Sequence, residues 1–166
     1  SSMVAQFDDS DFEIDRAAST DVFTLAFNSA KAPLDEVRVR SALSMAIDRD
    51  QIVSKIYHGT KTAAKDFTSP LVPEYTDDLP GVENLEHNAE KAKELWDKAD
   101  AISPWSGEFK IAYNADGGHK DWVDAVCNQL KNTLGIEAAG DPYPTFSDIR
   151  ERVTDRELRR LNGGMI

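Results

Sequence analysis

The sequence predicts a single α/β domain in which a small mixed β-sheet is flanked by helices. The 166 residues, 40% of them hydrophobic, suffice for one compact domain with a sizeable core. Residues 108–139 follow a strand, helix, strand pattern whose short connections require a right-handed crossover and a parallel strand pair. Amphipathic helical periodicity recurs on both sides of this unit, at residues 37–47 and 89–100. Together these patterns indicate one α/β unit and not two separate domains.

The first expected element is a strand at residues 22–28. Residues 1–20 are polar and acidic, so we expect them to be loosely ordered and to precede a single α/β lobe at residues 21–166. In the strand, Val22, Thr24 and Ala26 alternate with aromatic and apolar residues in a run that is rich in β-branched side chains. Asn28 ends this run.

Two helices are expected next, each with its own cap. Asp35 is a natural N-cap for a helix that continues to Ile47. Asp48 starts a second helix, which we expect Gly59 to end in the left-handed conformation. Residues 60–87 contain three prolines and no sustained period, which predicts a long ordered loop over a surface.

The second half of the chain alternates helices and strands, and each boundary carries a turn or cap residue. A turn is expected at residues 141–144, and Thr145 is expected to cap the helix that begins at Phe146. The expected elements are a helix at 89–100 capped by Asn88, a strand at 108–113, a helix at 119–134 closed by Gly135, a strand at 136–139, a helix at 146–153 and a short helix at 154–161.

Charge and cysteine content exclude several partners. The 19 basic and 30 acidic residues give a net charge of −11, which opposes binding to nucleic acid or to anionic lipid surfaces. No stretch reaches the roughly 20 apolar residues that span a bilayer, and the first thirty residues lack a leader pattern. Cys127 has no second cysteine with which to form a disulfide, and its apolar neighbours predict a core thiol.

Catalytic and metal chemistry find no support in the residue pattern. His119 and Cys127 are eight residues apart on one expected helix, about 12 Å along its axis, so they form no dyad. His58, His87 and His119 are scattered, without the spacing of a metal site. We therefore expect no catalytic residue, no metal and no cofactor.

Residues 23–59 carry a combination of motifs that resembles one protein family. An Asn at the end of a strand is followed by a Pro, by an Arg-rich helix start, and by an Ala-Ile-Asp-Arg segment. The matching residues are Asn28, Pro33, Val37, Arg38, Val39, Arg40, Ala42, Leu43, Ala46, Ile47, Asp48, Arg49, Ile52 and Val53. Residues 88–95 and 134–136 extend the match to nearly all of 22–153. The chain resembles the family 5 extracellular solute-binding proteins, the peptide- and nickel-binding components of ABC importers.

This resemblance implies a periplasmic-binding-protein-like lobe, the second of a two-lobed receptor that closes around an oligopeptide. It implies a peptide ligand, ABC permease subunits and the other lobe as partners, with no catalysis. In the family, a Trp followed shortly by an Asp grips the ligand's amino group just beyond the region that corresponds to Ile166. The parent protein is then expected to be extracytoplasmic, either in a periplasm or lipid-anchored on the outer face of the membrane. We expect it to associate with the membrane only through such an anchor.

Four residues are candidates for ligand binding by this resemblance. His119 matches a family position that meets the ligand's carboxylate, and a helix N-terminus also favours an anion. The alternative is a solvated first-turn histidine. Arg150 matches an arginine near the peptide's C-terminal end, or it is a solvated helix residue. Ala26 and Asn28 match a strand that faces the cleft, although Asn28 also suits the turn before Pro33.

Two other classes of function stay open at this point. One is an autonomous acidic interaction domain that shares only ancestry with peptide receptors. The weaker one is a hydrolase-like or metal-dependent enzyme, which needs a convergent cluster of titratable side chains. A leader peptide in the parent gene and a Trp-to-Asp motif after Ile166 would favour the receptor over both.

Overall fold

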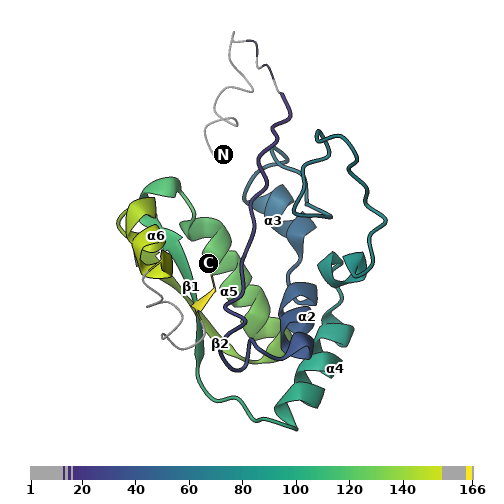
Figure 1. Cartoon of the computed structure of the whole chain (residues 1–166), viewed down its shortest axis with the longest axis vertical. Coiled ribbons are helices and arrows are strands. Elements are labelled where there is room, and N and C mark those ends of the chain that lie inside the picture. Colours follow the sequence, from purple (N-terminus) through teal and green to yellow (C-terminus); the bar gives the residue numbers. More distant parts are fainter. Residues whose placement is uncertain (1–12, 14, 16, 155–163, 166) are drawn as a thin grey trace.

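The structure is a computed structural model that describes residues 13, 15, 17–154 and 164–165 (Figure 1). Helices and strands alternate through its second half, as the sequence predicts. The elements are α2 (Val37–Met45), α3 (Arg49–Lys55), η1 (Val82–Leu85), α4 (Ala89–Asp100), β1 (Glu108–Asn114), η2 (Ala115–Gly117), α5 (Lys120–Leu134), β2 (Glu137–Tyr143), α6 (Phe146–Thr154) and β3 (Gly164–Met165). The expected short helix at 154–161 and most of the expected acidic segment at 1–20 lie outside the described residues.

The sheet has the strand order β2-β1-β3, and both strand pairs are parallel. The expected parallel pair of β1 and β2 is confirmed, with Glu108 opposite Glu137 and Asn114 opposite Tyr143. The described sheet is parallel, however, and not mixed. The turn expected at 141–144 is also wrong, because β2 continues through Pro142. An edge strand accommodates a proline, since its outer side forms no ladder.

The strand expected at residues 22–28 does not form. These residues are extended, but only Phe27 makes a bridge, and Figure 1 draws the segment as a long trace that leads toward α2. Leu25 and Phe27 pack against the core, whereas Phe23 is 60% exposed. Within the described residues, the alternating pattern thus produces an extended segment with a single bridge and no ladder.

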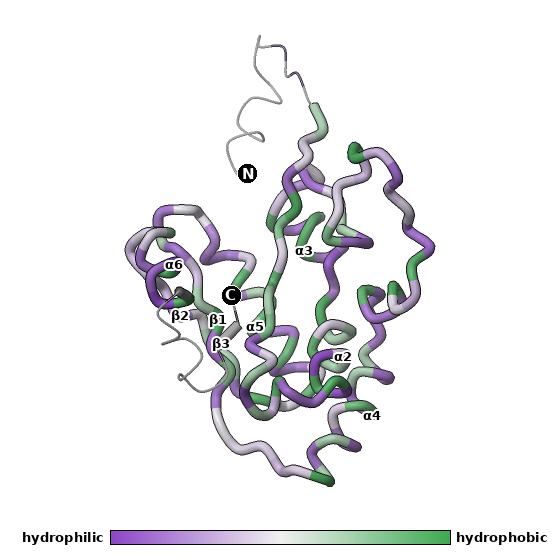
Figure 2. Tube along the Cα trace, in the orientation of Figure 1, coloured by the Kyte–Doolittle hydropathy of each residue, from purple (hydrophilic) through white to green (hydrophobic). Residues whose placement is uncertain are grey.

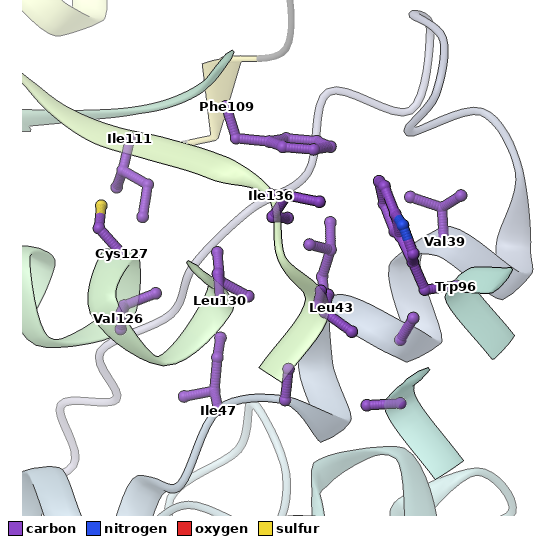
Figure 3. Close-up of a cluster of buried hydrophobic side chains, with 14 of the residues drawn as sticks. Val39, Leu43, Ile47, Trp96, Phe109, Ile111, Val126, Cys127, Leu130 and Ile136 are labelled. Carbon is purple, nitrogen blue, oxygen red and sulfur yellow. The ribbon is translucent and has the colours of Figure 1, made fainter. Parts of the chain in front are cut away.

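The core lies between the sheet and three helices (Figure 3). The predicted apolar stripe of α5 is confirmed, since it is buried on the same side as Phe109 and Ile111 of β1. Val39 and Leu43 of α2 and Trp96 of α4 extend this cluster. The buried members of the α5 stripe are Val123, Val126, Cys127, Leu130 and Leu134.

A smaller apolar cluster places α6 against the sheet. Ala112 of β1, Tyr143 of β2 and Ile149 of α6 are buried together. Successive side chains of a strand point to opposite faces, so Ala112 meets α6 while Ile111 and Tyr113 join the larger core. The sheet is therefore covered on one face by α5 and on the other by α6.

The helix caps follow the sequence closely, with one shift. Asp48 and Asn88 cap α3 and α4 by accepting from Gln51 N at 2.8 Å and Lys91 N at 2.9 Å. For α2 the cap is Glu36 and not Asp35, because the Glu36 carboxylate accepts from Arg38 N at 3.1 Å and also pairs with the Arg38 guanidinium at 3.0 Å.

The boundary signals at Gly59 and Thr145 have different outcomes. Gly59 takes the left-handed conformation, φ 71°, but α3 already ends at Lys55. Thr145 caps α6 as expected, since its hydroxyl accepts from Asp148 N at 3.3 Å while the Asp148 carboxylate accepts from Thr145 N at 2.8 Å.

Arg49 fastens the end of the long loop to the helices. Its guanidinium donates to the carbonyl oxygens of Ser44 at 3.0 Å and Leu85 at 2.9 Å and to the Ser44 hydroxyl at 2.9 Å. Burial lowers the pKa of Arg49 from its ordinary value. The loop over residues 60–87 therefore returns to a fixed point beside α2.

In the part of the chain that the structure describes, no helix is both long and apolar enough to cross a membrane.

Candidate functional site

The carboxyl edge of the parallel sheet is the natural place for a site. In open α/β sheets, ligands bind beyond the carboxyl ends of the strands, where connecting loops and helix N-termini converge. Here β1 ends at Asn114 and leads through η2 into α5, while β2 ends at Tyr143 and leads into α6 (Figure 1). The N-termini of α5 and α6 thus lie at this edge.

His119 occupies the N-cap position of α5 and is half-buried. Its Nδ1 lies 3.0 Å from Nε1 of Trp122, one turn further along the helix. An indole nitrogen only donates, so His119 Nδ1 accepts and the ring proton of the neutral imidazole sits on Nε2. His119 is therefore held in one orientation and presents a donor, which is the chemistry that a carboxylate requires.

Gly117 makes room for this arrangement. A Cβ atom at Gly117 would lie 2.5 Å from Nε2 of His119 and 2.5 Å from Nδ2 of Asn114. Gly118 follows with φ 67°, a conformation that side chains other than glycine adopt rarely. The Gly-Gly pair is thus the local reason why the His119 ring fits over the turn after β1.

His119 belongs to a cluster of rings that the sequence pattern does not predict. The Phe23 ring lies 6.0 Å from the His119 ring, and the Lys61 ammonium lies 4.2 Å from the Phe23 centroid and 5.1 Å from that of Tyr57. Burial, and then the charge of Asp121, raise the pKa of Tyr57. We call Phe23, Tyr57, Lys61, His119 and Trp122 the aromatic cluster.

Three separate segments supply the aromatic cluster. Phe23 comes from the extended N-terminal segment, Tyr57 and Lys61 follow α3, and the other two residues open α5. Their proximity is a property of the tertiary structure. The one local signal was the spacing of three residues between His119 and Trp122, which places both on one helix face.

Arg150 lies on the exposed side of α6, apart from the aromatic cluster. It sits between Phe146 and Val153, which are themselves exposed, and no ion pair or hydrogen bond joins it to His119 among the described residues. The neighbouring Arg152 instead lies over the Tyr143 ring at 4.9 Å and reaches its hydroxyl at 3.5 Å. Burial is the largest cause that raises the pKa of Tyr143.

Ala26 and Asn28 lie on the extended segment that contains Phe23. Ala26 is exposed and Asn28 is half-buried. The Asn28 side-chain oxygen accepts from Ala30 N at 3.4 Å, and its carbonyl accepts from Lys31 N at 3.2 Å. These bonds fit the turn-stabilising alternative, while a role in ligand binding stays a prediction.

Among the described residues, Cys127 is a buried thiol and no cluster of metal-ligating side chains is present. Cys127 is 7% exposed, and burial raises the pKa of its thiol to about 11, so the thiol stays protonated at neutral pH. No group of three or more His, Cys, Asp or Glu side chains within this part of the chain is placed to hold a metal ion. The aromatic cluster therefore offers aromatic faces, one histidine donor and one basic side chain, Lys61.

Comparison with known sequences gives a consistent picture. The model of the bacterial extracellular solute-binding proteins, family 5 middle region, matches residues 1–165. The periplasmic oligopeptide-binding protein of Salmonella typhimurium is 33% identical over 135 residues, which are 76% of this chain and 24% of the relative. The heme-binding protein A of Haemophilus influenzae is 35% identical over 136 residues, 81% of this chain and 24% of the relative. The chain thus spans about a quarter of the length of these relatives.

Solved structures show the same similarity in three dimensions. The oligopeptide-binding protein AppA of Bacillus subtilis, in complex with a nonapeptide, matches with a TM-score of 0.66 and 26% identity, over 77% of this chain and 27% of that protein. The murein tripeptide binding protein of Escherichia coli matches with a TM-score of 0.64 and 27% identity, over 78% of this chain and 26% of its own.

Proposed function

From the premise that this chain belongs to the family 5 bacterial extracellular solute-binding proteins, we propose that it is one lobe of a two-lobed peptide receptor. The receptor captures oligopeptides outside the cytoplasm and delivers them to the permease subunits of an ABC importer. This chain contributes the second lobe at residues 21–166, and the fold is that of a periplasmic-binding-protein-like lobe.

One observation carries the choice of peptides as the ligand class. The matched relatives whose names state a ligand are mostly peptide-binding proteins, including the Salmonella protein and a dipeptide-binding protein of Escherichia coli that is 35% identical over 95 residues. Heme and nickel appear among the relatives' names as well. The aromatic cluster suits a peptide because its rings offer apolar contact while His119 offers a donor to a carboxylate.

The proposed contact residues are His119, Arg150, Asn28 and Ala26. His119 presents its Nε2 donor beside the N-terminus of α5, where the helix dipole favours a negative charge. A cleft between two lobes excludes water from such contacts, whereas one lobe leaves them in solvent, where an ion pair contributes about 0–1 kcal/mol. Binding therefore needs the second half of the cleft.

We further infer that the protein binds without catalysing a reaction. Membership in a family of solute-binding proteins supports this. Its place is extracytoplasmic, with membrane association only through a lipid anchor of the parent protein. The acidic balance of the chain, −11, supports a partner other than nucleic acid.

Titration calorimetry of the full-length parent protein tests the proposal. A synthetic library of di- to pentapeptides is the probe, and native mass spectrometry identifies any ligand that copurifies. We expect at least one peptide to bind with a submicromolar dissociation constant. Tight binding of heme or of nickel ions together with no response to any peptide would contradict the peptide assignment.

His119→Ala in the parent protein tests the site. A hydrogen bond to a charged group contributes about 1.5–3 kcal/mol, so we expect the dissociation constant for peptide to rise about ten- to a hundredfold. His87→Ala is the matched control, because His87 lies 3.7 Å from Asp48 and away from the aromatic cluster. Equal affinities of the two variants would remove His119 from the site.

A further inference from the structure

The hydrogen bond between Trp122 and His119 bears on which ligands the site can take. Trp122 Nε1 lies 3.0 Å from His119 Nδ1, and the two rings meet edge to face with their centroids 5.9 Å apart. Both residues lie at the start of α5, three positions apart, which places them on one face of the helix. An indole nitrogen donates a hydrogen bond and accepts none. The Nδ1 lone pair of His119 is therefore used inside the protein.

The other ring nitrogen of His119 lies near a second donor. Nε2 of His119 and Nδ2 of Asn114 each lie 2.5 Å from the point that a Cβ of Gly117 would occupy, so they are no further apart than twice that distance. Asn114 Nδ2 donates to the Asp116 carboxylate at 2.6 Å, and this fixes the orientation of the amide because an ionised carboxylate only accepts. Two N–H donors thus lie together over the turn after β1.

The hydrogen bond also selects one orientation of the His119 ring. The Phe23 ring lies 6.0 Å away on the extended segment, and Figure 2 shows hydrophobic positions along this segment where it passes α3 and α5. Ring packing alone does not distinguish the two sides of an imidazole. A half-turn about χ2 would put Cδ2 in front of the indole donor and remove the hydrogen bond. Trp122 therefore determines which nitrogen of His119 faces inward.

This arrangement opposes metal ligation by His119. A neutral imidazole has one proton and one free lone pair, and it binds a metal ion through the nitrogen that has the lone pair. For Nε2 to bind a metal, the proton must move to Nδ1, where it would face the indole N–H of Trp122 at 3.0 Å. Histidines that ligate metals almost always donate their second N–H to a carboxylate, a carbonyl or water. Trp122 presents a donor at this position, so an anion suits Nε2 better than a metal does.

We propose that Trp122 is a positioning residue that sets the ligand class of the site. It makes His119 a hydrogen-bond donor to a carboxylate, and it prevents His119 from ligating the metal of a nickel complex or a heme. The inference rests on the proposed function, since the carboxylate is that of a bound peptide. It supplies a physical reason for this chain to differ in ligand from the relatives that are named for heme and nickel.

The first test determines the position of the proton without any ligand. Histidine is labelled with nitrogen-15 in the full-length parent protein, and His119→Gln assigns the His119 signals. At mildly alkaline pH we expect only the form protonated on Nε2, and we expect Trp122→Phe to give a mixture of both neutral forms because the donor is lost. A wild-type His119 protonated on Nδ1, or an unchanged form in Trp122→Phe, would overturn the proposal.

Trp105→Phe is the matched control for every arm. It makes the same substitution in the loop before β1, and Trp105 Nε1 has no hydrogen-bond partner among the described residues. The form of His119 should therefore stay that of the wild type in this variant. A mixture of forms in Trp105→Phe equal to that in Trp122→Phe would contradict a specific role for Trp122.

The second test uses Ni²⁺ as the probe. Paramagnetic nickel broadens the signals of a histidine that binds it, and His58 and His87 serve as internal references. We expect the His119 signals of Trp122→Phe to broaden at an about fivefold lower nickel concentration than those of the wild type or of Trp105→Phe, because no hydrogen bond must be broken. Equal nickel sensitivity of His119 in the three proteins would overturn the proposal.

Calorimetry with the tightest-binding peptide of the library completes the test. We expect Trp122→Phe to bind the peptide about two- to tenfold more weakly than the wild type does, which is the effect of one hydrogen bond. Unchanged peptide affinity in Trp122→Phe would overturn the proposal. If no peptide binds the wild-type parent while the proton position and the nickel response are as expected, the proposed function fails and the role of Trp122 stands.

Discussion

His119 owes its orientation to its neighbours more than to its own helix. Trp122 takes up Nδ1 by donating a hydrogen bond, and Gly117 leaves the space in which Nε2 lies. Resemblance to a family makes His119 a candidate ligand-binding residue from the sequence alone, and this role stays a prediction. The sequence did not identify Trp122 and Gly117 as the residues that position His119, because their contacts with its ring are visible only in the folded structure.

Gly117→Ala tests whether the position of the His119 ring matters for binding, because this variant keeps His119 but displaces its ring. The new Cβ would lie 2.5 Å from Nε2 of His119, so the ring must move away from its place above the turn. In the parent protein we expect peptide affinity to fall about five- to twentyfold, a loss of about 1–2 kcal/mol, as expected for a disturbed hydrogen bond. Calorimetry measures the affinity, and urea unfolding checks that the fold is kept. Unchanged affinity would show that ligand does not use this orientation.

Cys127 is expected to be inert in the folded chain. The pKa of Cys127 is raised from 9.0 to about 11, and burial is the largest cause of this shift. Almost no thiolate therefore exists at pH 8. Alkylation by iodoacetamide should be slow in the native protein and fast in urea, as mass spectrometry can follow. As the pH rises from 9 toward 11, the unfolded thiol ionises first, so the free energy of unfolding should fall in that window. Rapid native alkylation at pH 8 would contradict the buried assignment.

At the scale of elements, β2 packs closely on the core because it contains a glycine. A Cβ at Gly140 would lie 2.9 Å from Cε1 of Tyr113 and 3.0 Å from Cγ1 of Val123. The strand therefore approaches β1 and α5 more closely than a larger residue would allow. Sequence patterns ended this strand at Ala139, because Gly140 and Pro142 favour turns when tertiary context is ignored.

Gly140→Ala should lower the free energy of unfolding by about 1–3 kcal/mol, since the Tyr113 ring and Val123 must shift to admit the methyl group. Ala139→Ser provides the comparison, because the side chain at 139 points to the opposite face of β2. Urea unfolding followed by circular dichroism measures both variants. If Gly140→Ala lowered the free energy of unfolding by less than Ala139→Ser, the close packing of β2 at Gly140 would be contradicted.

The elements that the sequence predicted well share a local cause. Asp48, Asn88 and Thr145 all cap the helices expected of them, and the apolar period of α5 marked its buried face. The strand at residues 22–28 failed because a strand needs a partner, and pairing is not encoded in the alternation of its own side chains. The third strand of the described sheet is β3, which pairs with β1 in parallel, and not the segment at residues 22–28.

At the scale of the whole molecule, our proposal assigns the aromatic cluster to a face that a second lobe covers. The aromatic cluster borders the extended segment at residues 17–28. It was not predicted as a unit, because it joins segments that are far apart in the sequence. The chain spans about a quarter of its relatives' length, which fits a lobe whose binding surface is completed by another part of the receptor.

The most direct test of this account compares the isolated 166-residue chain with its full-length parent. Calorimetry with the tightest-binding peptide of the library gives both dissociation constants under the same conditions. We predict submicromolar binding by the parent and at most millimolar binding by the chain alone, because half a cleft leaves the peptide in solvent. Submicromolar binding by the isolated chain would contradict the claim that this lobe is functionally incomplete.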